Sequence, residues 1–555
     1  MSLEDKCLSS RREAAVCAGW QSESTKRDSL LIFFLGVTAF TVALAPEFIN
    51  FDARFALFAR EMLRDGPSFF PTTYHTPYPD YPAASTFLIY LASLPFGRVT
   101  PFTAVLPTAV ASALVLVITY QIGAISSRRR GLAAALFALF TVEFLAMSRS
   151  IALDQYVSLA TVLSFYLVYS SDCLGRHRRL WLLAPAWASG FAFRGPLGLL
   201  IPAAVTCVYY LWNGRFKRML LAGTLAGGLL VLCLGGLLLA ARAQGGTPFL
   251  RQVIEAQVTG RFGEGGPGFA YYWYGSLVSC AVTYPLAILV AVSRFRDIVN
   301  RRTGEDRFLG VLILWVIVVL LALSIPAAKK TRYVMPIIPA LSLIASSFLA
   351  DASLSGLLLR TKRAFLGVCA FLPLISVVGV GGLLLFACLR QPQWRMCALT
   401  TLGLLIPPVI VAWKLDRGWR GVPGRDMYLL AVGAFTFVVV HIEVVEPITY
   451  SRERTVPFVR QVEAIREEAQ GTVTFFRVGP DAEDIKFMAN LSRSLEPQFA
   501  SSIETLWDSP GVHYIIAKEA VFRSLPLDED RPMRLLARGK IGHRDCVVFT
   551  PDGRR

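Results

Sequence analysis

Residues 219–241 read MLLAGTLAGGLLVLCLGGLLLAA and contain no charged side chain. A helix of this length can cross the hydrocarbon core of a bilayer, which needs about 20 apolar residues. Similar apolar runs recur from residue 29 to about residue 441, and 54% of the chain is hydrophobic. The runs are continuous rather than alternating, which excludes a membrane β-barrel. The sequence therefore predicts a polytopic α-helical membrane protein.

The basic residues lie mostly in the short breaks between these runs. GRFKR (214–218) precedes the run quoted above, and RRR (128–130) and RTKR (360–363) occupy two other breaks. Short loops rich in Lys and Arg are typical of the cytoplasmic side of a membrane protein. The formal charge of +17 is therefore explained by topology, and no nucleic-acid partner is expected.

Alternating the breaks between the two sides gives thirteen crossings, with the N-terminus inside and the C-terminus outside. Residues 1–28 are polar and no cleavage site follows the first apolar run, so we expect a cytoplasmic tail and a retained signal anchor. The expected spans are 29–47, 104–124, 131–147, 155–171, 180–193, 196–212, 219–241, 272–293, 308–325, 333–350, 364–388, 396–413 and 426–441.

Three regions follow from this pattern: the tail, a transmembrane domain (29–441) with an outer loop (48–103), and a domain outside the membrane (442–555). In the last region TVTFFRV (472–478), HYIIA (513–517) and CVVFT (546–550) predict strands, and PFVRQVEAIREEA (457–469) predicts an amphipathic helix. We expect a small α/β domain without a nucleophile or phosphate-loop motif, in a structural or acceptor-docking role.

Two segments are too short for ordinary spans. Residues 180–193 and 196–212 are separated by Arg194-Gly195-Pro196, so we expect a helical hairpin with Arg194 facing a cavity, because an arginine facing lipid at depth is costly. Residues 84–96 are bounded by prolines and are expected to lie along the outer interface.

The outer loop carries the most unusual composition. Residues 51–83, FDARFALFAREMLRDGPSFFPTTYHTPYPDYPA, combine acids and arginines with aromatic residues and prolines. A simple connector needs neither this length nor these charges, and such loops commonly carry function. The acids would lie at the membrane surface, where a lipid-linked polar group could meet them.

Several motifs in order resemble one family. DARFALFAREML (52–63), YPDYP (78–82) and FLIYLASLPFG (87–97) are followed by SRSIALDQ (148–155), FRGPLGLLIP (193–202), Arg261-Phe262 with Tyr271-Tyr272, and KKTRYVMPIIPAL (329–341). Together they resemble the aminoarabinose–lipid A transferase and protein O-mannosyltransferase group of GT-C membrane glycosyltransferases, over about residues 29–350.

The resemblance implies transfer of a monosaccharide from a polyprenyl-phosphate donor to a lipid, glycan or protein acceptor at the outer face of a bacterial inner membrane, among membrane lipids. The family's first loop commonly begins with two adjacent acids, the first being the candidate base. Here Phe51 stands at the first acid and Asp52 at the second. Either Asp52 serves after a one-residue shift, or the usual base is missing.

The chemistry needs a carboxylate and several cations. A carboxylate would deprotonate or orient the acceptor, and Asp52 and Asp154 are the catalytic candidates. Asp52 could instead pair with Arg54 or Arg60, and Asp154 could instead complement the dipole at the start of a helix. A cavity near Asp52, Asp80 and Asp154 would hold the sugar. The candidate substrate-binding residues are Arg54, Asp80, Tyr81 and Tyr333.

The leaving phosphate gains charge as the glycosidic bond breaks, so cations should surround it. Arg261, Lys330 and Arg332 lie on expected outside segments, against the positive-inside pattern, although basic side chains at an interface can also simply snorkel. Family members often carry a lysine where Tyr81 stands here. Lys329 or Arg194 could supply that charge, and Arg194 completes the phosphate-binding candidates.

No cofactor is expected, and a bound divalent metal is the alternative. The resemblance implies that such a metal would be held by an acid of the first loop and a histidine of the long outer loop near residue 257. This chain offers Asp80, but Ala256-Gln257 stand where the histidine would be. His75 is the only histidine in either large outer loop, and a lone histidine is a poor metal signal.

Two other classes compete with a glycosyltransferase. A transporter or flippase would need polar residues deep in several spans and an internal repeat, neither of which the sequence displays. A non-catalytic membrane scaffold would keep the helices without aligned outer acids, and Phe51 at the first acid position favours that alternative.

Overall fold

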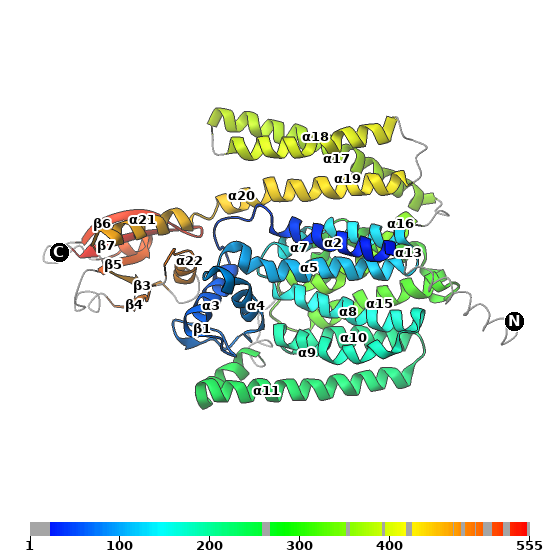
Figure 1. Cartoon of the computed structure of the whole chain (residues 1–555), viewed down its shortest axis with the longest axis horizontal. Helices are drawn as coiled ribbons and strands as arrows, with labels where there is room; N and C mark the ends of the chain where they lie inside the picture. Colours follow the sequence, from blue (N-terminus) through cyan, green and yellow to red (C-terminus); the bar gives the residue numbers. More distant parts are fainter. Residues whose placement is uncertain are drawn as a thin grey trace. The chain divides into compact units, whose positions relative to one another are not determined.

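The computed structural model (Figure 1) divides into two compact units. The helical unit comprises residues 1–42, 79–85 and 105–444, and the sheet unit comprises residues 43–78, 86–104 and 445–555. The residues described are 23–80, 82–257, 267–350, 356–390, 394–417, 424–469, 471–478, 483–493, 495–502, 513–525 and 533–551.

The helical unit is built almost entirely of apolar helices. Its elements are α2 (Glu23–Thr41), α5 (Pro101–Ala124), α6 (Arg128–Leu139), α7 (Val142–Ser148), α8 (Leu153–Leu174), η2 (His177–Leu182), α9 (Leu183–Arg194), α10 (Pro196–Trp212), α11 (Phe216–Gln257), α12 (Tyr271–Ser279), α13 (Thr283–Ser293), α14 (Phe295–Val299), α15 (Gly304–Ser324), η4 (Thr331–Ile337), α16 (Ile338–Ala350), α17 (Gly356–Arg390), α18 (Arg395–Arg417) and α19 (Arg425–Val440). Helix α5 begins in the sheet unit.

The helices pack in two groups (Figure 1). Helix α10 contacts α8, α9, α11 and α15, while α17, α18 and α19 contact one another. Among the described residues, eight helices are long and apolar enough to cross a membrane, or ten if each of two bent pairs counts as one span. On α11 large apolar side chains point outward, such as Val231 at 73% exposure and Leu239 at 70%. Apolar surface of this kind is stable against lipid but not against water.

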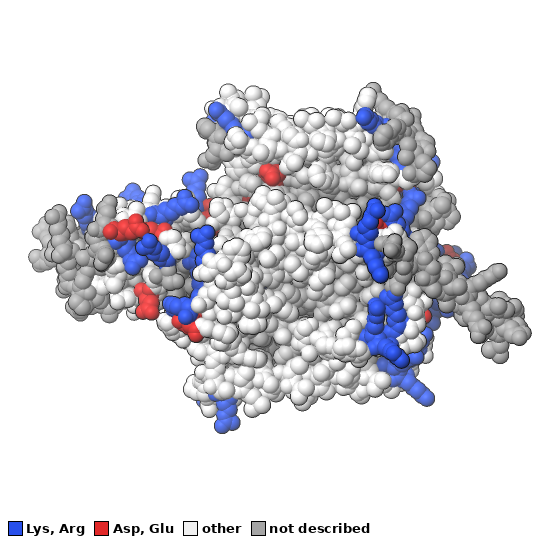
Figure 2. Space-filling view, viewed as in Figure 1, with Lys and Arg blue, Asp and Glu red and all other residues white. Residues whose placement is uncertain are grey.

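The charge distribution agrees with helices that cross a membrane. Figure 2 shows a band across the helices that is almost free of charge, with Lys and Arg on both sides of it, including a large group at one end of the helices. The basic breaks 128–130 and 214–218 join α5 to α6 and α10 to α11. An uncharged band with a basic end is the pattern of a bilayer-spanning bundle.

Two of the expected spans are pairs of helices joined by a bend. Residues 131–147 form α6 and α7, which meet at 78°, and residues 272–293 form α12 and α13, which meet at 115°. The two breaks face each other, because the hydroxyl oxygens of Thr141 and Thr283 lie 3.3 Å apart in a buried contact. Side-chain hydroxyls can satisfy polar groups that an interrupted helix exposes. The first span is also displaced: α2 ends at Thr41 rather than near residue 47.

The expected hairpin of short helices is present. Gly195 takes a left-handed φ of 63° and ends α9, and Pro196 then begins α10. Gly190 and Gly198 let the two backbones touch, because a Cβ on either residue would overlap the other's carbonyl group. This close approach fixes the direction in which Arg194 leaves the last turn of α9.

The sheet unit combines the outer loop with the C-terminal residues. Its elements are α3 (Asp52–Asp65), β1 (Thr72–Thr73), β2 (Thr76–Pro77), α4 (Ala84–Ser93, starting in the helical unit), η1 (Leu94–Phe96), the π-helical η6 (His441–Val445, ending in this unit), α20 (Glu446–Ser451), α21 (Thr455–Ala469), β3 (Thr472–Phe476), α22 (Glu483–Ala489), β4 (Gln498–Ala500), β5 (His513–Lys518), α24 (Glu519–Arg523), β6 (Met533–Ile541) and β7 (Arg544–Pro551). The three predicted strands and the predicted helix in this region are confirmed as β3, β5, β7 and α21.

The C-terminal sheet has the strand order β4-β3-β5-β7-β6. Strand β3 is parallel to β4 and β5, whereas β7 is antiparallel to β5 and β6. A small apolar core formed by Phe476, Ile515 and Phe549 lies on one face. Helix α3 packs against α22, so the outer loop and this sheet form one folded unit.

Candidate functional site

Three segments of the helical unit bring their charged ends together. Asp154 lies in the first turn of α8, Arg194 is the last residue of α9, and Lys330, Arg332 and Tyr333 lie at the start of η4. Helix α8 contacts both α9 and η4. Each residue therefore stands at a helix end, where side chains from different helices can meet.

Asp154 is held between two guanidinium groups. Its Oδ1 lies 3.1 Å from Nε of Arg194, and its Oδ2 lies 3.2 Å from Nε of Arg332. Asp154 is 4% exposed and Arg194 is 6% exposed. A charge buried to this extent must be paired, because removing it from water without a partner costs several kcal/mol. Arg194, which the sequence predicted to face a cavity, pairs with this carboxylate.

The cluster holds more cations than directly paired carboxylates. Arg194 and Arg332 share the carboxylate of Asp154, and Lys330 has no ion pair among the described residues, while Asp80 acts on Lys330 and Glu143 on Arg332 at longer range. The pKa of Lys330 lies below its usual value because the residue is partly buried and because Arg332 and Arg194 repel its charge. An anion bound here would relieve that repulsion, so the cluster is suited to bind a phosphate.

Aromatic residues fix the geometry of the cations. The guanidinium carbon of Arg194 lies 4.6 Å from the centre of the Tyr333 ring, and that of Arg332 lies 6.0 Å from it. The hydroxyl of Tyr272 accepts a hydrogen bond from the backbone N–H of Lys330 at 3.1 Å and lies 3.3 Å from its carbonyl oxygen. The fully buried Tyr272 was not among the predicted site residues, although the Tyr271-Tyr272 pair in the family motif pointed to it.

Asp80 and Gln257 also meet in the helical unit. The amide Nε2 of Gln257 donates to the backbone carbonyl of Asp80. The family resemblance placed a possible metal at Asp80 and near residue 257. The structure brings Asp80 and Gln257 together, and a hydrogen bond from the Gln257 amide connects them. Within the described ranges, no three His, Cys, Asp or Glu side chains are grouped so that they could hold a metal ion.

Lys329 has its own role beside the cluster. Its Nζ donates to the carbonyl oxygens of Pro267 and Pro326, at 3.0 and 2.9 Å. Family members often carry a lysine at the position of Tyr81. Its charge is therefore better supplied here by Lys330, Arg194 or Arg332 than by Lys329. Arg261 and Tyr81, both predicted at the site, lie outside the described residues.

Asp52 and Arg54 belong to the sheet unit. Asp52 opens α3 and is 8% exposed, with its N–H bonded to the carbonyl of Ile49. Arg54 donates to the hydroxyl of Tyr78 at 2.6 Å and lies over the same ring. Arg60 donates instead to the carbonyl oxygens of Met488 and Leu491, at 3.1 and 2.8 Å. The alternative in which Arg60 is the partner of Asp52 is therefore wrong.

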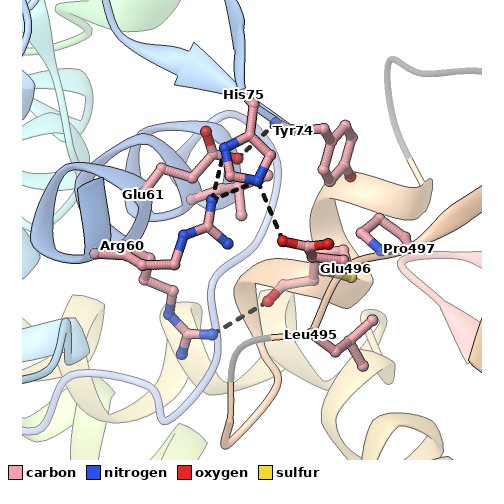
Figure 3. A pocket seen from close by; sticks show the side chains of 10 residues that line it. Arg60, Glu61, Tyr74, His75, Leu495, Glu496 and Pro497 are labelled. Carbon is pink, nitrogen blue, oxygen red and sulfur yellow. Dashed lines mark hydrogen bonds and ion pairs between the residues drawn. The ribbon is translucent and has the colours of Figure 1, made fainter.

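A polar pocket lies between α3, the β1–β2 hairpin and residues 495–497 of the sheet unit (Figure 3). It encloses about 150 Å³. Its wall includes the buried Glu61, one oxygen of which accepts the N–H of Tyr74 at 2.6 Å, while the other has no hydrogen-bond partner among the described residues. Tyr74 and His75 have φ of 52° and 63°, left-handed values typical of a two-residue hairpin turn.

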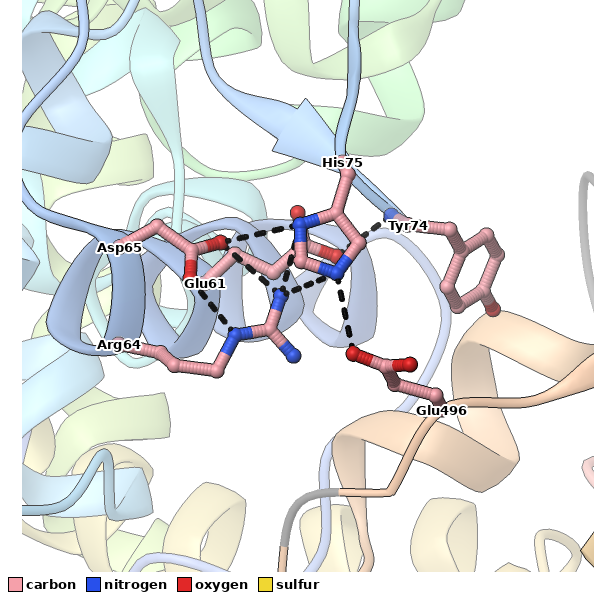
Figure 4. A network of polar contacts seen from close by, with 6 residues as sticks. All are labelled: Glu61, Arg64, Asp65, Tyr74, His75 and Glu496. Carbon is pink, nitrogen blue, oxygen red and sulfur yellow. Dashed lines mark hydrogen bonds and ion pairs between the residues drawn. The ribbon is translucent and has the colours of Figure 1, made fainter.

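His75 joins this pocket to a surface network of charges (Figure 4). Its ring nitrogens lie 3.5 Å from Asp65 and 3.4 Å from Glu496, and Arg64 pairs with Asp65 at 2.8 Å. These groups are largely exposed, so each pair adds little stability. Sequence reasoning noted His75 only as an isolated residue, because its partner Glu496 lies 421 positions away.

Comparison with known proteins supports the predicted resemblance. A model of the family described as dolichyl-phosphate-mannose-protein mannosyltransferase matches residues 80–237. An undecaprenyl phosphate-alpha-4-amino-4-deoxy-L-arabinose arabinosyl transferase of Pseudomonas savastanoi pv. phaseolicola is 26% identical over 431 residues, covering 75% of this chain and 78% of that protein. The enzyme of the same description from Serratia proteamaculans is 25% identical over 384 residues, covering 66% and 68%.

The fold agrees with solved structures. ArnT from Cupriavidus metallidurans in the apo state superposes with a TM-score of 0.67 at 15% identity, covering 95% of this chain and 98% of that one. The same protein bound to undecaprenyl phosphate gives a TM-score of 0.66 at 16% identity, covering 94% and 97%. The predicted resemblance to the aminoarabinose transferase and mannosyltransferase group is confirmed, and the chain has an ArnT-like, mostly helical fold with apolar candidate spans.

Proposed function

We propose that this protein is a multi-pass membrane glycosyltransferase that moves a monosaccharide from a polyprenyl-phosphate donor to a lipid, glycan or protein acceptor. The cluster of Arg194, Lys330 and Arg332 around Asp154 carries the proposal, because it offers a phosphate three cations at helix ends, of which Lys330 has no ion pair among the described residues. The similarity to transferases named for undecaprenyl phosphate and aminoarabinose supports a donor of this chemistry.

The reaction assigns different roles to the cations and the acids. The acceptor oxygen or nitrogen attacks the anomeric carbon, and the bond from that carbon to the phosphate oxygen breaks. The departing polyprenyl phosphate gains negative charge, which Lys330, Arg332 and Arg194 would stabilise. The acceptor proton passes to a carboxylate, for which we propose Asp52. Arg261 would add a further cation, and Arg54, Asp80, Tyr81 and Tyr333 would contact the sugar.

For Asp154, predicted from the sequence as a catalytic residue, we propose a positioning role. Both of its oxygens lie within ion-pair distance of arginines, so it is poorly placed to accept a proton. We assign it the orientation of the two guanidinium groups toward the phosphate. A carboxylate that fixes two arginines limits the reorganisation needed when the leaving group develops charge.

We propose a topology of thirteen crossings in the inner membrane. Counting each bent pair as one, the described residues hold ten candidate spans, and α2, α9 and α10 would be the other three. Residues 1–28 would be cytoplasmic, residues 29–441 would form the transmembrane domain with the outer loop 48–103, and residues 442–555 would form an α/β domain in the periplasm. The donor and the acceptor would then meet at the outer leaflet.

The test separates donor binding from the chemical step. Lys330→Gln and Arg332→Gln should each weaken binding of a polyprenyl-phosphate sugar about 10- to 100-fold, the effect of losing one charge-assisted hydrogen bond of about 1.5–3 kcal/mol. Asp52→Asn should leave donor binding nearly unchanged and slow transfer roughly 10²- to 10⁴-fold, as for loss of a general base. Binding and transfer of labelled sugar are measured in membranes with matched expression.

Arg296→Gln is the matched control, because Arg296 is exposed on α14 and away from the cluster. It should bind and transfer normally. Normal donor binding in both cluster variants would remove these cations from the site. A wild-type protein that binds donor but transfers no sugar to any acceptor in its own membranes would favour the non-catalytic scaffold.

A further inference from the structure

A second hollow in the sheet unit carries a concentrated positive charge. It encloses about 400 Å³ between α3, the turn 97–101 that leads into α5, and residues 489–492 that follow α22. Its lining includes Arg60, Arg64 and Arg98 but neither Asp nor Glu. All of these residues belong to the sheet unit, and none belongs to the donor-phosphate cluster described above.

The walls of this hollow are tied together by hydrogen bonds. The side chain of Asn490 accepts the N–H of Phe48 at 2.8 Å and donates to the carbonyl of Phe48 at 2.9 Å. Arg60 donates to the carbonyl oxygens of Met488 and Leu491. Segments more than 400 positions apart are thereby held in one arrangement before any ligand binds. Preorganisation of this kind reduces the entropy lost on binding.

Contacts within the protein pair only some of the guanidinium groups that line this hollow with a carboxylate. Arg60 binds carbonyl groups at the end of α22, where a cation complements the helix dipole. Arg64 pairs with Asp65. Arg98 is exposed and makes no hydrogen bond or ion pair to the described residues, and Arg60 has no ion pair among them. Burial lowers the pKa of Arg60 to about 10, with Glu463 acting in the opposite direction. Two guanidinium charges therefore remain without a paired carboxylate.

Neighbouring apolar side chains indicate what carries the anion. Phe87, Leu91 and Leu94 follow one another at helical spacing and are 40%, 43% and 47% exposed, and Phe96 is 59% exposed. They directly precede the turn 97–101, which ends where the apolar helix α5 begins. Phe96 immediately precedes the lining residue Gly97 in the sequence, and exposed apolar residues followed by Arg98 suit a lipid, whose chains and charged head need both kinds of surface.

We propose that this hollow binds a lipid headgroup that carries a phosphate monoester. A monoester bears a charge of about −1.5 to −2 at neutral pH, which matches the two unpaired guanidinium groups better than the single charge of a diester. Guanidinium groups also bind phosphate oxygens in a bidentate manner. The backbone N–H groups of Thr100 and Thr103 at the start of α5 contribute less to phosphate binding, because each already donates to the side-chain hydroxyl of the other residue. This binding site is independent of the proposed transfer reaction.

The experiment measures binding of dihexanoyl phosphatidic acid to the purified full-length protein in neutral detergent. The background is Lys330→Gln/Arg332→Gln, so that the donor-phosphate cluster does not contribute. Arg98→Gln should weaken binding about 10-fold and Arg98→Glu about 100-fold, while Arg534→Gln should have no effect. Arg534 is the matched control because it is exposed on β6 and does not line the hollow.

The lipid series tests the headgroup. Dihexanoyl phosphatidylglycerol, a diester, should bind several-fold more weakly than phosphatidic acid, and dihexanoyl phosphatidylcholine should not compete. Arg98 is exposed, so its variants should melt at the same temperature as the parent. Equal affinity in Arg98→Glu and the parent would overturn the site, as would equal affinity for phosphatidylcholine. Competition by inorganic phosphate as strong as that by phosphatidic acid would overturn the lipid assignment.

Discussion

At the scale of single residues, charge placement separates the two units of this protein. In the helical unit, Asp154 pairs with both Arg194 and Arg332. In the sheet unit, Asp484 is fully buried and accepts a hydrogen bond from the hydroxyl of Tyr74 at 2.8 Å. One carboxylate is therefore paired with two guanidinium groups, whereas the other is buried with a neutral donor.

Burial raises the pKa of Asp484 from 3.8 to about 6, although the hydrogen bond from Tyr74 opposes the shift. The folded state therefore holds a proton on Asp484 that the unfolded state has released, so this group's contribution to stability falls as pH rises from about 4 to 6. We predict that Asp484→Asn raises the stability of the sheet unit at pH 7.5 by on the order of 2 kcal/mol.

Thermal unfolding of the full-length protein at pH 4.5 and pH 7.5 provides the measurement. The variant should lose less stability than the wild type as pH rises between these two values. Asp545→Asn is the control, because the side chain of Asp545 is 62% exposed. A pH dependence that is the same in wild type and Asp484→Asn would contradict the prediction.

At the scale of elements, the site depends on where helices end. Helix α9 stops at Arg194 because Gly195 adopts a left-handed conformation and Pro196 starts α10. Gly190 and Gly198 then allow backbone contact between α9 and α10. Small residues permit such close helix packing in membranes. The same packing holds the guanidinium of Arg194 against Asp154, so a change on the glycine face should reach the site.

We predict that Gly198→Ala destabilises the α9–α10 pair by about 1–3 kcal/mol, because an added methyl group in a packed contact forces the backbones apart. Donor binding should weaken as Arg194 moves. Gly227→Ala on α11 is the matched control, because a Cβ at Gly227 would have nothing within 4 Å. Melting temperature and donor binding are compared for both variants. Equal behaviour of the two would show that the contact between α9 and α10 does not position Arg194.

At the scale of the whole molecule, the chain alternates between its two units. It leaves the helical unit after residue 42, returns at residues 79–85, and enters the sheet unit finally after residue 444. The outer loop therefore folds with the C-terminal sheet although more than 340 residues separate them. Because the two segments share one unit, the proposed topology requires both to lie on the same side of the membrane.

The proposed topology predicts that the C-terminus lies in the periplasm. Alkaline phosphatase fused after Arg555 should be active, because it folds only where disulfides form. A fusion in the basic segment 214–218 should be inactive and serves as the inside control. Activity of the second fusion without activity of the first would reverse the orientation.

The apolar runs determined the helical membrane class by themselves, because length and hydrophobicity decide whether a segment can cross a bilayer. The short runs rich in β-branched and aromatic residues at 472–478, 513–517 and 546–550 likewise predicted the strands, most of whose residues the structure buries without alternation. The motifs also selected Asp154, Arg194, Lys330, Arg332 and Tyr333, which the structure groups together.

Only the tertiary structure decided which charges pair. Asp154 and Arg332 are far apart in sequence, and no local pattern indicates that two arginines share one carboxylate. The bends at residues 140–141 and 280–282 also escaped prediction. No proline lies within residues 131–147, Pro285 marks the second bend only by its place in the first turn of α13, and the breaks involve contacts such as Thr141 with Thr283. The hollow around Arg98 was likewise hidden, since its walls come from segments that meet only after the chain has folded.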